Sequence, residues 1–285
     1  MVPGLLKWVG NKQRFASAIV SNMPYAFQDY YEPFLGSGAV LAELLNRRYS
    51  EMFPSFSNVY ASDVLPFLID IFNITKKEPD RLILYYSEQV EEYNKDPDEK
   101  YSSIRNRFNT NPNPWDFCLL SRTCYSGVIR FRKADGYMST PRGPHKPLQT
   151  STFSRRVKEW STLIQNVDFS VLDYSLAMDR PKAGDVVYCD PPYTHSQSIL
   201  YGSQQFDIGE LWRKIYECKR RGVYVLLSIN GFRESRKKDI SAQIPRGLFE
   251  RELTINCGTS MIDRLQNNGS KMDGEQVHDK LLMTW

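Results

Sequence analysis

The sequence predicts an α/β fold whose sheet-forming body is interrupted once by a mainly helical insert. Short apolar runs typical of buried strands recur along the chain, and one of them leads through Gly36-Ser37-Gly38 into a helical pattern. Between Asp63 and Val167 the strand pattern stops and helical patterns replace it. A chain of 285 residues is long enough for one large domain with such an insert. We therefore expect a body formed by residues 1–64 and 166–285 and an inserted subdomain formed by residues 65–165.

The apolar runs predict seven strands in the body, because each run is short and is bounded by turn-forming residues. A helix is expected directly after the glycine turn, where apolar residues recur at helical spacing. The seven strands are expected at residues 30–32, 58–63, 167–172, 185–189, 223–229, 248–255 and 280–285.

The insert is expected to contain four helices and a β-hairpin. The helices lie at residues 67–75, 79–93, 101–108 and 115–124, and Asn111-Pro112-Asn113-Pro114 breaks the chain before the last of them. Basic and aromatic side chains are interleaved in residues 128–132 and 136–140, on either side of a short turn, which predicts the hairpin. Residues 258–274, farther along the chain, are polar and contain glycine, and they predict a loop.

The tetrapeptide Asp190-Pro191-Pro192-Tyr193 ends the apolar run of the fourth strand and carries the clearest chemistry. The prolines have fixed φ angles and no N–H, so their carbonyl groups are aimed rigidly. A carboxylate and a proline carbonyl offer only acceptors, and Tyr193 offers a face for stacking. Such a set suits a flat nucleobase with an exocyclic amino group, and methyl transfer to its nitrogen. The plainer alternative is a strand that stops at a proline turn.

A second motif, Glu32-Pro33-Phe34-Leu35-Gly36-Ser37-Gly38, lies between the first strand and the first helix of the body. A strand, a Gly-x-Gly turn and a helix form the nucleotide-binding start of a Rossmann-like unit. The third glycine of the dinucleotide fingerprint is missing, which favours a smaller nucleoside over a pyrophosphate. The second strand ends in Asp63, and an acid there can accept hydrogen bonds from ribose hydroxyls.

Charge and cysteine content limit the remaining possibilities. Residues 121–160 contain nine Lys or Arg and two acids, a net charge of +7, whereas the whole chain carries only +4 and the rest therefore −3. Such a concentration of positive charge indicates contact with phosphates, although a solvated loop is the plainer alternative. Five cysteines without C-x-x-C spacing indicate a reduced cytoplasm and no metal site. We find no secretory leader and no apolar run long enough to span a membrane.

With Lys7-Trp8-Val9-Gly10-Asn11-Lys12 at the amino terminus, the chain resembles the Dam-type DNA adenine methyltransferases, the alpha or D12 class. The glycine motif, the long insert and the Asp-Pro-Pro-Tyr motif follow in the order of that class. The stretches Ala61-Ser62-Asp63 and Val277-His278-Asp279-Lys280 are also similar. The resemblance covers nearly the whole chain. It implies a Rossmann-like seven-stranded methyltransferase sheet with a target recognition subdomain carrying the hairpin.

The resemblance also implies roles for single residues. S-adenosyl-L-methionine would be the cofactor, and the base would be flipped into a pocket at the catalytic residues. Asp173 is the weakest candidate for the cofactor site, because an acid at the end of the third strand often only caps a helix. The catalytic residues would be Asp190, Pro191, Pro192 and Tyr193. The cofactor-binding residues would be Trp8, Lys12, Glu32, Phe34, Gly36, Ser37, Gly38, Asp63, Asp173 and Asp190.

Residues 121–130 are similar to the DNA-reading stretch of the class. Tyr125 stands where the family inserts a ring into the base stack, and Arg130 stands where it reads guanine, which suits a guanidinium. Ser126 replaces the usual Asn, and the hairpin turn is about one residue longer, so the sequence GATC is not implied. Contact with phosphate alone is the alternative for each arginine. The DNA-binding residues would be Arg122, Tyr125, Ser126, Arg130, Arg132, Arg142 and Lys146.

The expected partner is double-stranded DNA, and no association with a membrane is expected. We expect a monomer or weak dimer. Its expected location is the cytoplasm, in association with the nucleoid. A cognate restriction endonuclease and an orphan or phage methylase remain open alternatives. Three alternative functions fit the sequence less well. A cytosine-N4 methyltransferase usually has Ser where Asp190 stands, a dinucleotide oxidoreductase needs the missing glycine, and a non-catalytic DNA-binding protein would have lost a motif.

Overall fold

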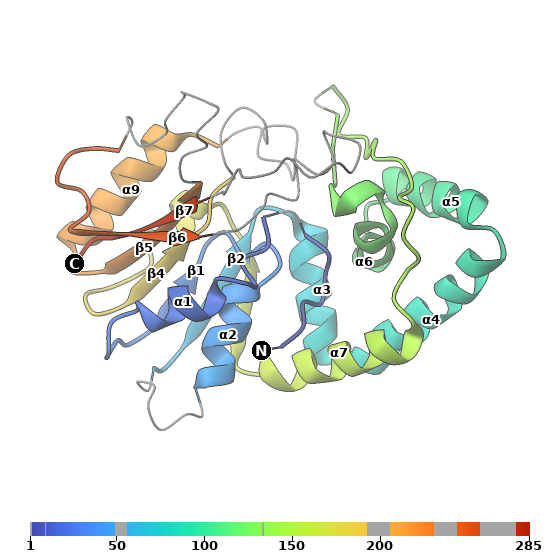
Figure 1. Cartoon of the computed structure of the whole chain (residues 1–285), viewed down its shortest axis with the longest axis horizontal. Helices are drawn as coiled ribbons and strands as arrows, with labels where there is room; N and C mark the ends of the chain where they lie inside the picture. Colours follow the sequence, from blue (N-terminus) through green and yellow to red (C-terminus); the bar gives the residue numbers. More distant parts are fainter. Residues whose placement is uncertain are drawn as a thin grey trace.

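The computed structural model describes residues 2–8, 10–48, 56–132, 134–192, 206–230, 244–256 and 278–285. Its centre is a seven-stranded sheet in the order β3-β2-β1-β4-β5-β7-β6 (Figure 1). All seven expected strands are confirmed, with ends that differ from the prediction by at most three residues. The strands are β1 (Tyr30–Glu32), β2 (Val59–Asp63), β3 (Val167–Val171), β4 (Val186–Cys189), β5 (Tyr224–Asn230), β6 (Arg251–Asn256) and β7 (His278–Met283).

The strand order reverses between β1 and β4. β2 pairs with one side of β1, and β3 pairs with the outer side of β2. β4 pairs with the other side of β1, and β5 pairs with β4. All four of these pairs are parallel. β7 runs antiparallel to both β5 and β6. In open sheets of this kind, ligands bind beyond the carboxyl ends of the strands at the point where the order reverses. The topology therefore directs the search for a site to the carboxyl ends of β1 and β4.

Both faces of the sheet are covered, which explains why the central strands are almost continuously apolar. Alternate residues of β4 enter different cores: Val186 and Tyr188 belong to one, and Val187 and Cys189 to the other. The first core packs against α1 (Ala16–Ser21) and α2 (Ala39–Arg47). The second packs against α8 (Tyr174–Ala177) and α9 (Ile208–Arg220).

The helical insert lies between β2 and β3 and occupies one side of the molecule, on the right in Figure 1. Proline at the start of α3, α4, α5 and α6 sets the first turn of each helix, where a missing N–H costs nothing. The four expected helices are present: the first three are two to six residues longer than predicted and the fourth is shifted by one residue, whereas α7 was not predicted. The elements are α3 (Pro66–Lys77), α4 (Pro79–Lys95), α5 (Pro97–Thr110), α6 (Pro114–Thr123), the 3-10 turn η1 (Tyr125–Gly127) and α7 (Thr150–Leu163).

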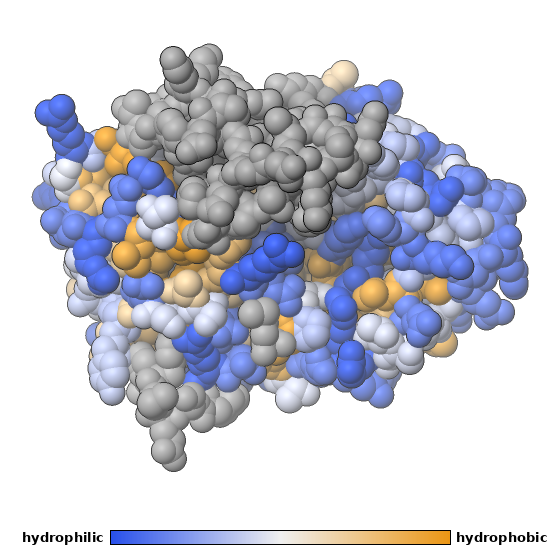
Figure 2. Space-filling view, in the orientation of Figure 1, coloured by the Kyte–Doolittle hydropathy of each residue, from blue (hydrophilic) through white to orange (hydrophobic). Residues whose placement is uncertain are grey.

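The outer surface of α4 and α5 is mainly hydrophilic in the view of Figure 2. The inner sides of these helices join the same buried core as the sheet, through side chains such as Tyr86 and Phe108. The division of the chain at residues 64/65 and 165/166 stays a prediction. Within the described ranges, we find no helix with both the length and the apolar character needed to cross a bilayer.

The expected hairpin differs in detail from two regular strands. The described residues 128–132 and 134–140 form two arms that lie side by side, and among them one β-bridge joins the arms, between Phe131 and Met138. The side chain of Asn109 on α5 takes the place of a neighbouring strand: it accepts the Met138 N–H at 2.7 Å and donates to the Met138 carbonyl at 3.2 Å. Thr140 Oγ1 similarly accepts the Arg130 N–H and donates to the Val128 carbonyl. Side chains thus satisfy backbone groups that a ladder would otherwise pair.

Candidate active site

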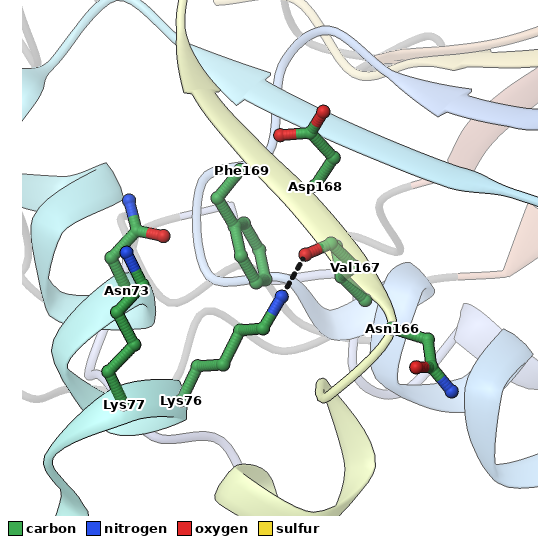
Figure 3. A pocket seen from close by; sticks show the side chains of 7 residues that line it. All are labelled: Asn73, Lys76, Lys77, Asn166, Val167, Asp168 and Phe169. Carbon is green, nitrogen blue, oxygen red and sulfur yellow. Dashed lines mark hydrogen bonds between the residues drawn. The ribbon is translucent and has the colours of Figure 1, made fainter.

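Three acidic residues meet at the carboxyl edge of the parallel strands. Glu32 ends β1, Asp63 ends β2, and Asp190 follows β4 directly. Because β1 is paired with both β2 and β4, the parallel register brings these positions to one edge. A separate pocket, lined by Lys76, Asp168 and neighbouring residues, lies at the start of β3 and is therefore at the opposite edge (Figure 3).

Lys12 holds Asp190 in a buried ion pair. Its Nζ lies 3.2 Å from Asp190 Oδ1 and 3.3 Å from Asp279 Oδ2, and the Lys12 side chain is 7% exposed. Burial by itself would lower the pKa of Lys12, but the two carboxylates more than offset it and the pKa is raised. Lys12 is therefore a fixed cation beside the Asp190 carboxylate. Asp279 had no predicted role; the similarity of residues 277–280 to the class was its only signal in the sequence.

Glu32 is buried beside this ion pair. Its carboxylate accepts a hydrogen bond of 2.7 Å from the Tyr30 hydroxyl. Burial raises the pKa of Glu32 to about 8; the Tyr30 hydrogen bond opposes the rise, and the charge of Asp190 adds to it. At neutral pH the side chain is thus mainly protonated. A buried carboxyl in this state is ready to ionise when a cation is placed beside it.

The glycine turn is fixed by the second strand. The Leu35 N–H donates to the Ser62 carbonyl, and the Gly36 N–H donates to Asp63 Oδ2 at 3.1 Å. Gly36 has φ +50°, and a Cβ built on it would lie 3.0 Å from the indole nitrogen of Trp8. Only glycine allows this backbone shape together with the close approach of Trp8. The turn therefore lies directly against both Trp8 and Asp63.

Asp63 itself is tied to this turn. Besides Gly36 it accepts the Leu65 N–H at 3.2 Å, and burial raises its pKa to about 6 against the lowering effect of these hydrogen bonds. Ser37, in the middle of the turn, is buried. Gly38 begins α2 with φ +68°, and a Cβ there would lie 3.1 Å from Trp160. The turn is thus packed from the side of α7 as well.

Aromatic rings line the neighbouring edge. Phe34 stacks on Tyr174 with ring centroids 5.0 Å apart and meets Phe206 edge-on at 6.1 Å. Asp173 is exposed and caps α8 by accepting from the Ser175 N–H at 2.8 Å. The capping alternative for Asp173 is therefore present in the structure, while its role at a cofactor stays a prediction.

The proline motif is described only in part. Pro191 is buried and Pro192 is half-buried directly after Asp190. Tyr193 lies outside the described residues, so its position relative to Asp190 stays a prediction.

Most of the residues that are predicted to contact DNA are accessible on the insert. Tyr125, Arg130, Arg132 and Lys146 lie on the surface of the insert, and Tyr125 is 45% exposed. Arg142 is half-buried and donates from Nε to Asp98 Oδ1 at 2.6 Å.

The structure does not bring Arg122 together with these residues. Its side chain is 7% exposed, and its guanidinium donates to the carbonyls of Gly4 and Leu5. Arg122 therefore joins α6 to the amino-terminal segment that leads to Trp8 and Lys12. A sequence pattern does not distinguish such a buried arginine from an exposed one, because both stand in the same basic stretch.

Ser126 has a strained backbone, with φ 60° and ψ 7°, and it is the only non-glycine residue with positive φ in the described part of the chain. Left-handed geometry costs an ordinary residue about 1–2 kcal/mol, and asparagine tolerates it better. We expect Ser126→Asn to raise the free energy of unfolding by about 0.5–1 kcal/mol in urea titrations. Ser139→Asn, on the same exposed segment, is the control and should change little. An equal effect of both variants would contradict the assignment of strain to Ser126.

Comparisons with known proteins identify the family of the chain. Residues 8–246 match the family model of the D12 class N6 adenine-specific DNA methyltransferases. A type II methyltransferase of Methanocaldococcus jannaschii is 29% identical over 253 residues, covering 80% of this chain and 84% of that protein. The DNA adenine methylases of Vibrio cholerae and Haemophilus influenzae are 27% and 26% identical, covering 91% and 88% of this chain and 93% and 87% of those proteins.

An α/β sheet with a glycine turn and a carboxylate–diproline motif at its switch point defines a nucleotide-binding transferase site. Since the family model covers most of the chain, the chain belongs to the D12 class N6 adenine-specific DNA methyltransferases. It is an adenine-specific DNA methyltransferase, as the sequence resemblance predicted.

Proposed function

We propose that the chain transfers the methyl group of S-adenosylmethionine to N6 of adenine within a specific sequence of duplex DNA, after the base has left the helix. The observation that carries this proposal is the position of Asp190. Its carboxylate is held by Lys12 at the switch point of the sheet, and the rigid Pro191 and Pro192 follow it directly in the chain. These groups are the acceptors that an adenine amino group needs.

The described residues fit the cofactor. S-adenosylmethionine would supply an electrophilic methyl group on a positively charged sulfur. We assign its ribose to Asp63, its ammonium group to Glu32 and its adenine to the surface near Asp173. The remaining part of the site would be formed by Trp8, Lys12, Phe34, Gly36, Ser37 and Gly38. Gly36 lacks a side chain and so lets the Trp8 indole lie directly against the turn that binds Asp63, which brings these three residues together and supports this assignment.

In this proposal the protein acts on the adenine amino group mainly through fixed acceptors. The amino nitrogen is a weak nucleophile because its lone pair is conjugated with the ring. Asp190 and the carbonyl of Pro191 accept its two N–H bonds and turn the lone pair out of the ring plane. The negative charge of Asp190 also stabilises the positive charge that grows on the nitrogen. Tyr193 would stack on the flipped base, and the proton would leave after methyl transfer.

Glu32 should release a proton when the cofactor binds. Because its pKa is raised to about 8, the free protein holds this proton at pH 6.5. An ammonium placed beside the carboxyl favours the ionised form and lowers the pKa, so that close to one proton should leave per bound cofactor. Titration calorimetry at pH 6.5 in buffers of different ionisation enthalpy measures this number. The release should fade as the pH rises through 8, where Glu32 is already ionised.

Two variants check the source of that proton. Glu32→Gln should abolish the proton release. It should also weaken the binding of the cofactor by about 1–3 kcal/mol, since a charged hydrogen-bond acceptor is lost. Glu43→Gln alters another buried carboxylate, which pairs with Arg47 on α2 outside the site, and should leave both quantities unchanged. Undiminished proton release in Glu32→Gln would assign the proton to another group.

For DNA, we propose that the surface of the insert meets the duplex. Tyr125 would enter the base stack from the strained turn at Ser126, Arg130 would read a base edge, and Arg132, Arg142 and Lys146 would contact phosphates. Arg122 is left out, because its guanidinium is already bound to the backbone of the amino-terminal segment. The same proposal places the enzyme in the cytoplasm, acting on the DNA of the nucleoid. It would act either together with a restriction endonuclease or as an orphan or phage methylase.

The direct test uses cofactor labelled with tritium in its methyl group. The protein is incubated with this cofactor and duplex DNA, and the DNA is then digested to nucleosides. Label in N6-methyladenine supports the proposal. Label in N4-methylcytosine, or binding of DNA without transfer of label, would overturn it. Methylation-sensitive sequencing of DNA from an expressing cell identifies the recognised site.

A further inference from the structure

β7 carries an acidic side chain to the catalytic edge of the sheet. Because β7 runs antiparallel to β5, its first residues lie beside the carboxyl end of β5, and Asp279 is paired with Asn230 there. The parallel β4 ends at this same edge, just before Asp190. The last strand in the chain thus reaches the site formed by the first strands.

The direction of the Asp279 side chain follows from the alternation along β7. Leu281 and Met283 enter the first core, whereas Leu282 enters the second. Asp279 shares its face with Leu281 and Met283, which is the face toward the amino-terminal segment that carries Lys12. The neighbouring Lys280 faces the other way and pairs with Glu252 on β6 at 2.8 Å.

Asp279 and Asp190 share one lysine. Lys12 Nζ lies 3.3 Å from Asp279 Oδ2 and 3.2 Å from Asp190 Oδ1, and the three side chains are only 11%, 19% and 7% exposed for Asp279, Asp190 and Lys12. A lysine has a flexible four-carbon stem, so a single carboxylate fixes the ammonium poorly. A second carboxylate at a similar distance restricts the position of the ammonium further.

From this arrangement we infer that Asp279 is a positioning residue for methyl transfer: it holds Lys12 against Asp190 and thereby fixes the carboxylate that receives the adenine amino group. The inference rests on the function proposed for Asp190. Asp279 touches neither substrate in this scheme. Its influence on the reaction passes entirely through Lys12.

Kinetics of the full-length protein test this role. We expect Asp279→Ala to lower the single-turnover rate at saturating DNA and cofactor by about 10–100-fold, because small misplacements of a catalytic group cost rates of this order. The KM value for DNA should change little. Asp279→Asn keeps an oxygen acceptor in the same place and should recover part of the rate. Lys280→Gln alters the adjacent residue on the opposite face of β7 and should behave as the wild type.

A double-mutant cycle separates this role from a general structural one. Lys12→Met should be slow, and adding Asp279→Ala to it should cost little more, because the route through Lys12 is already lost. Independent, additive losses would overturn the inference. A rate for Asp279→Ala equal to that of Lys280→Gln would overturn the inference as well. It would leave the function proposed for Asp190 unaffected. If Asp190→Ala and Lys12→Met were also as fast as the wild type, the proposed function itself would fall.

Chemical labelling gives a readout without catalysis. Trace acetylation followed by peptide mass spectrometry reports how accessible and how protonated each lysine is. Lys12 should be protected in the wild type relative to the exposed Lys146, and the protection should fall in Asp279→Ala but largely remain in Asp279→Asn. Unchanged protection of Lys12 in Asp279→Ala would show that Asp279 does not hold it, and would contradict the inference even if the variant were slow.

Discussion

Asp190→Ala should slow methyl transfer by about 10²–10³-fold, which is the usual cost of removing one preorganised group that stabilises a transition state. The change removes both an acceptor for the adenine amino group and the negative charge beside the nitrogen that becomes positive. Cofactor affinity should be largely preserved, because Asp63, Glu32 and the glycine turn are untouched. Single-turnover transfer of labelled methyl groups measures the rate, and calorimetry measures cofactor binding.

Two further variants make this result specific. Asp190→Asn keeps an oxygen acceptor but loses the charge, so it should be slow but faster than Asp190→Ala. Asp185, at the other end of β4, accepts the backbone N–H groups of Asp29 and Lys182. Asp185→Ala should therefore lower stability without a comparable loss in the single-turnover rate of the folded protein. A near wild-type rate for Asp190→Ala would remove Asp190 from the catalytic role.

The sheet could be predicted because its signals are local. A short apolar run bounded by turn residues predicts a strand wherever both faces are covered, and Val186–Cys189 is such a run. The motifs at Glu32, Asp63 and Asp190 follow their strands directly, so parallel topology alone brings them to one edge. Their meeting at the β1/β4 switch point thus follows from the sequence once the strand order is known.

Other parts of the site depend on contacts that no local pattern encodes. Lys12 and Asp279 lie near opposite ends of the chain and meet only because β7 is inserted between β5 and β6. Arg122 stands in a basic stretch, but burial in α6 turns it toward the carbonyls of Gly4 and Leu5. The outward-facing backbone groups of Met138 in the hairpin are bound by Asn109, a side chain from another element.

Arg130 and Lys146 allow the proposed reading of bases to be tested separately from the proposed binding of phosphates. Both side chains are exposed, and neither forms an ion pair among the described residues. Arg132 and Arg142, by contrast, are paired with Asp135 and Asp98. Arg130 follows directly on the buried Ile129, and its backbone is held on both sides, by Thr140 Oγ1 at its N–H and by the Ser139 N–H at its carbonyl. Lys146 lies in an exposed stretch beyond the hairpin.

Arg130→Ala should therefore cost about 1–3 kcal/mol on the recognised sequence and little on random DNA, because a bidentate contact with guanine is lost. Lys146→Ala should weaken both complexes about equally and reduce the salt dependence by about one unit, since one phosphate contact and its released counterion are lost. Titrations of both duplexes at two salt concentrations measure these effects, with each variant serving as the control for the other. Equal losses on specific and random DNA for Arg130→Ala would make Arg130 a phosphate contact. Base reading would then pass to Arg132 or Arg142, each of which would first have to leave its carboxylate partner on the protein.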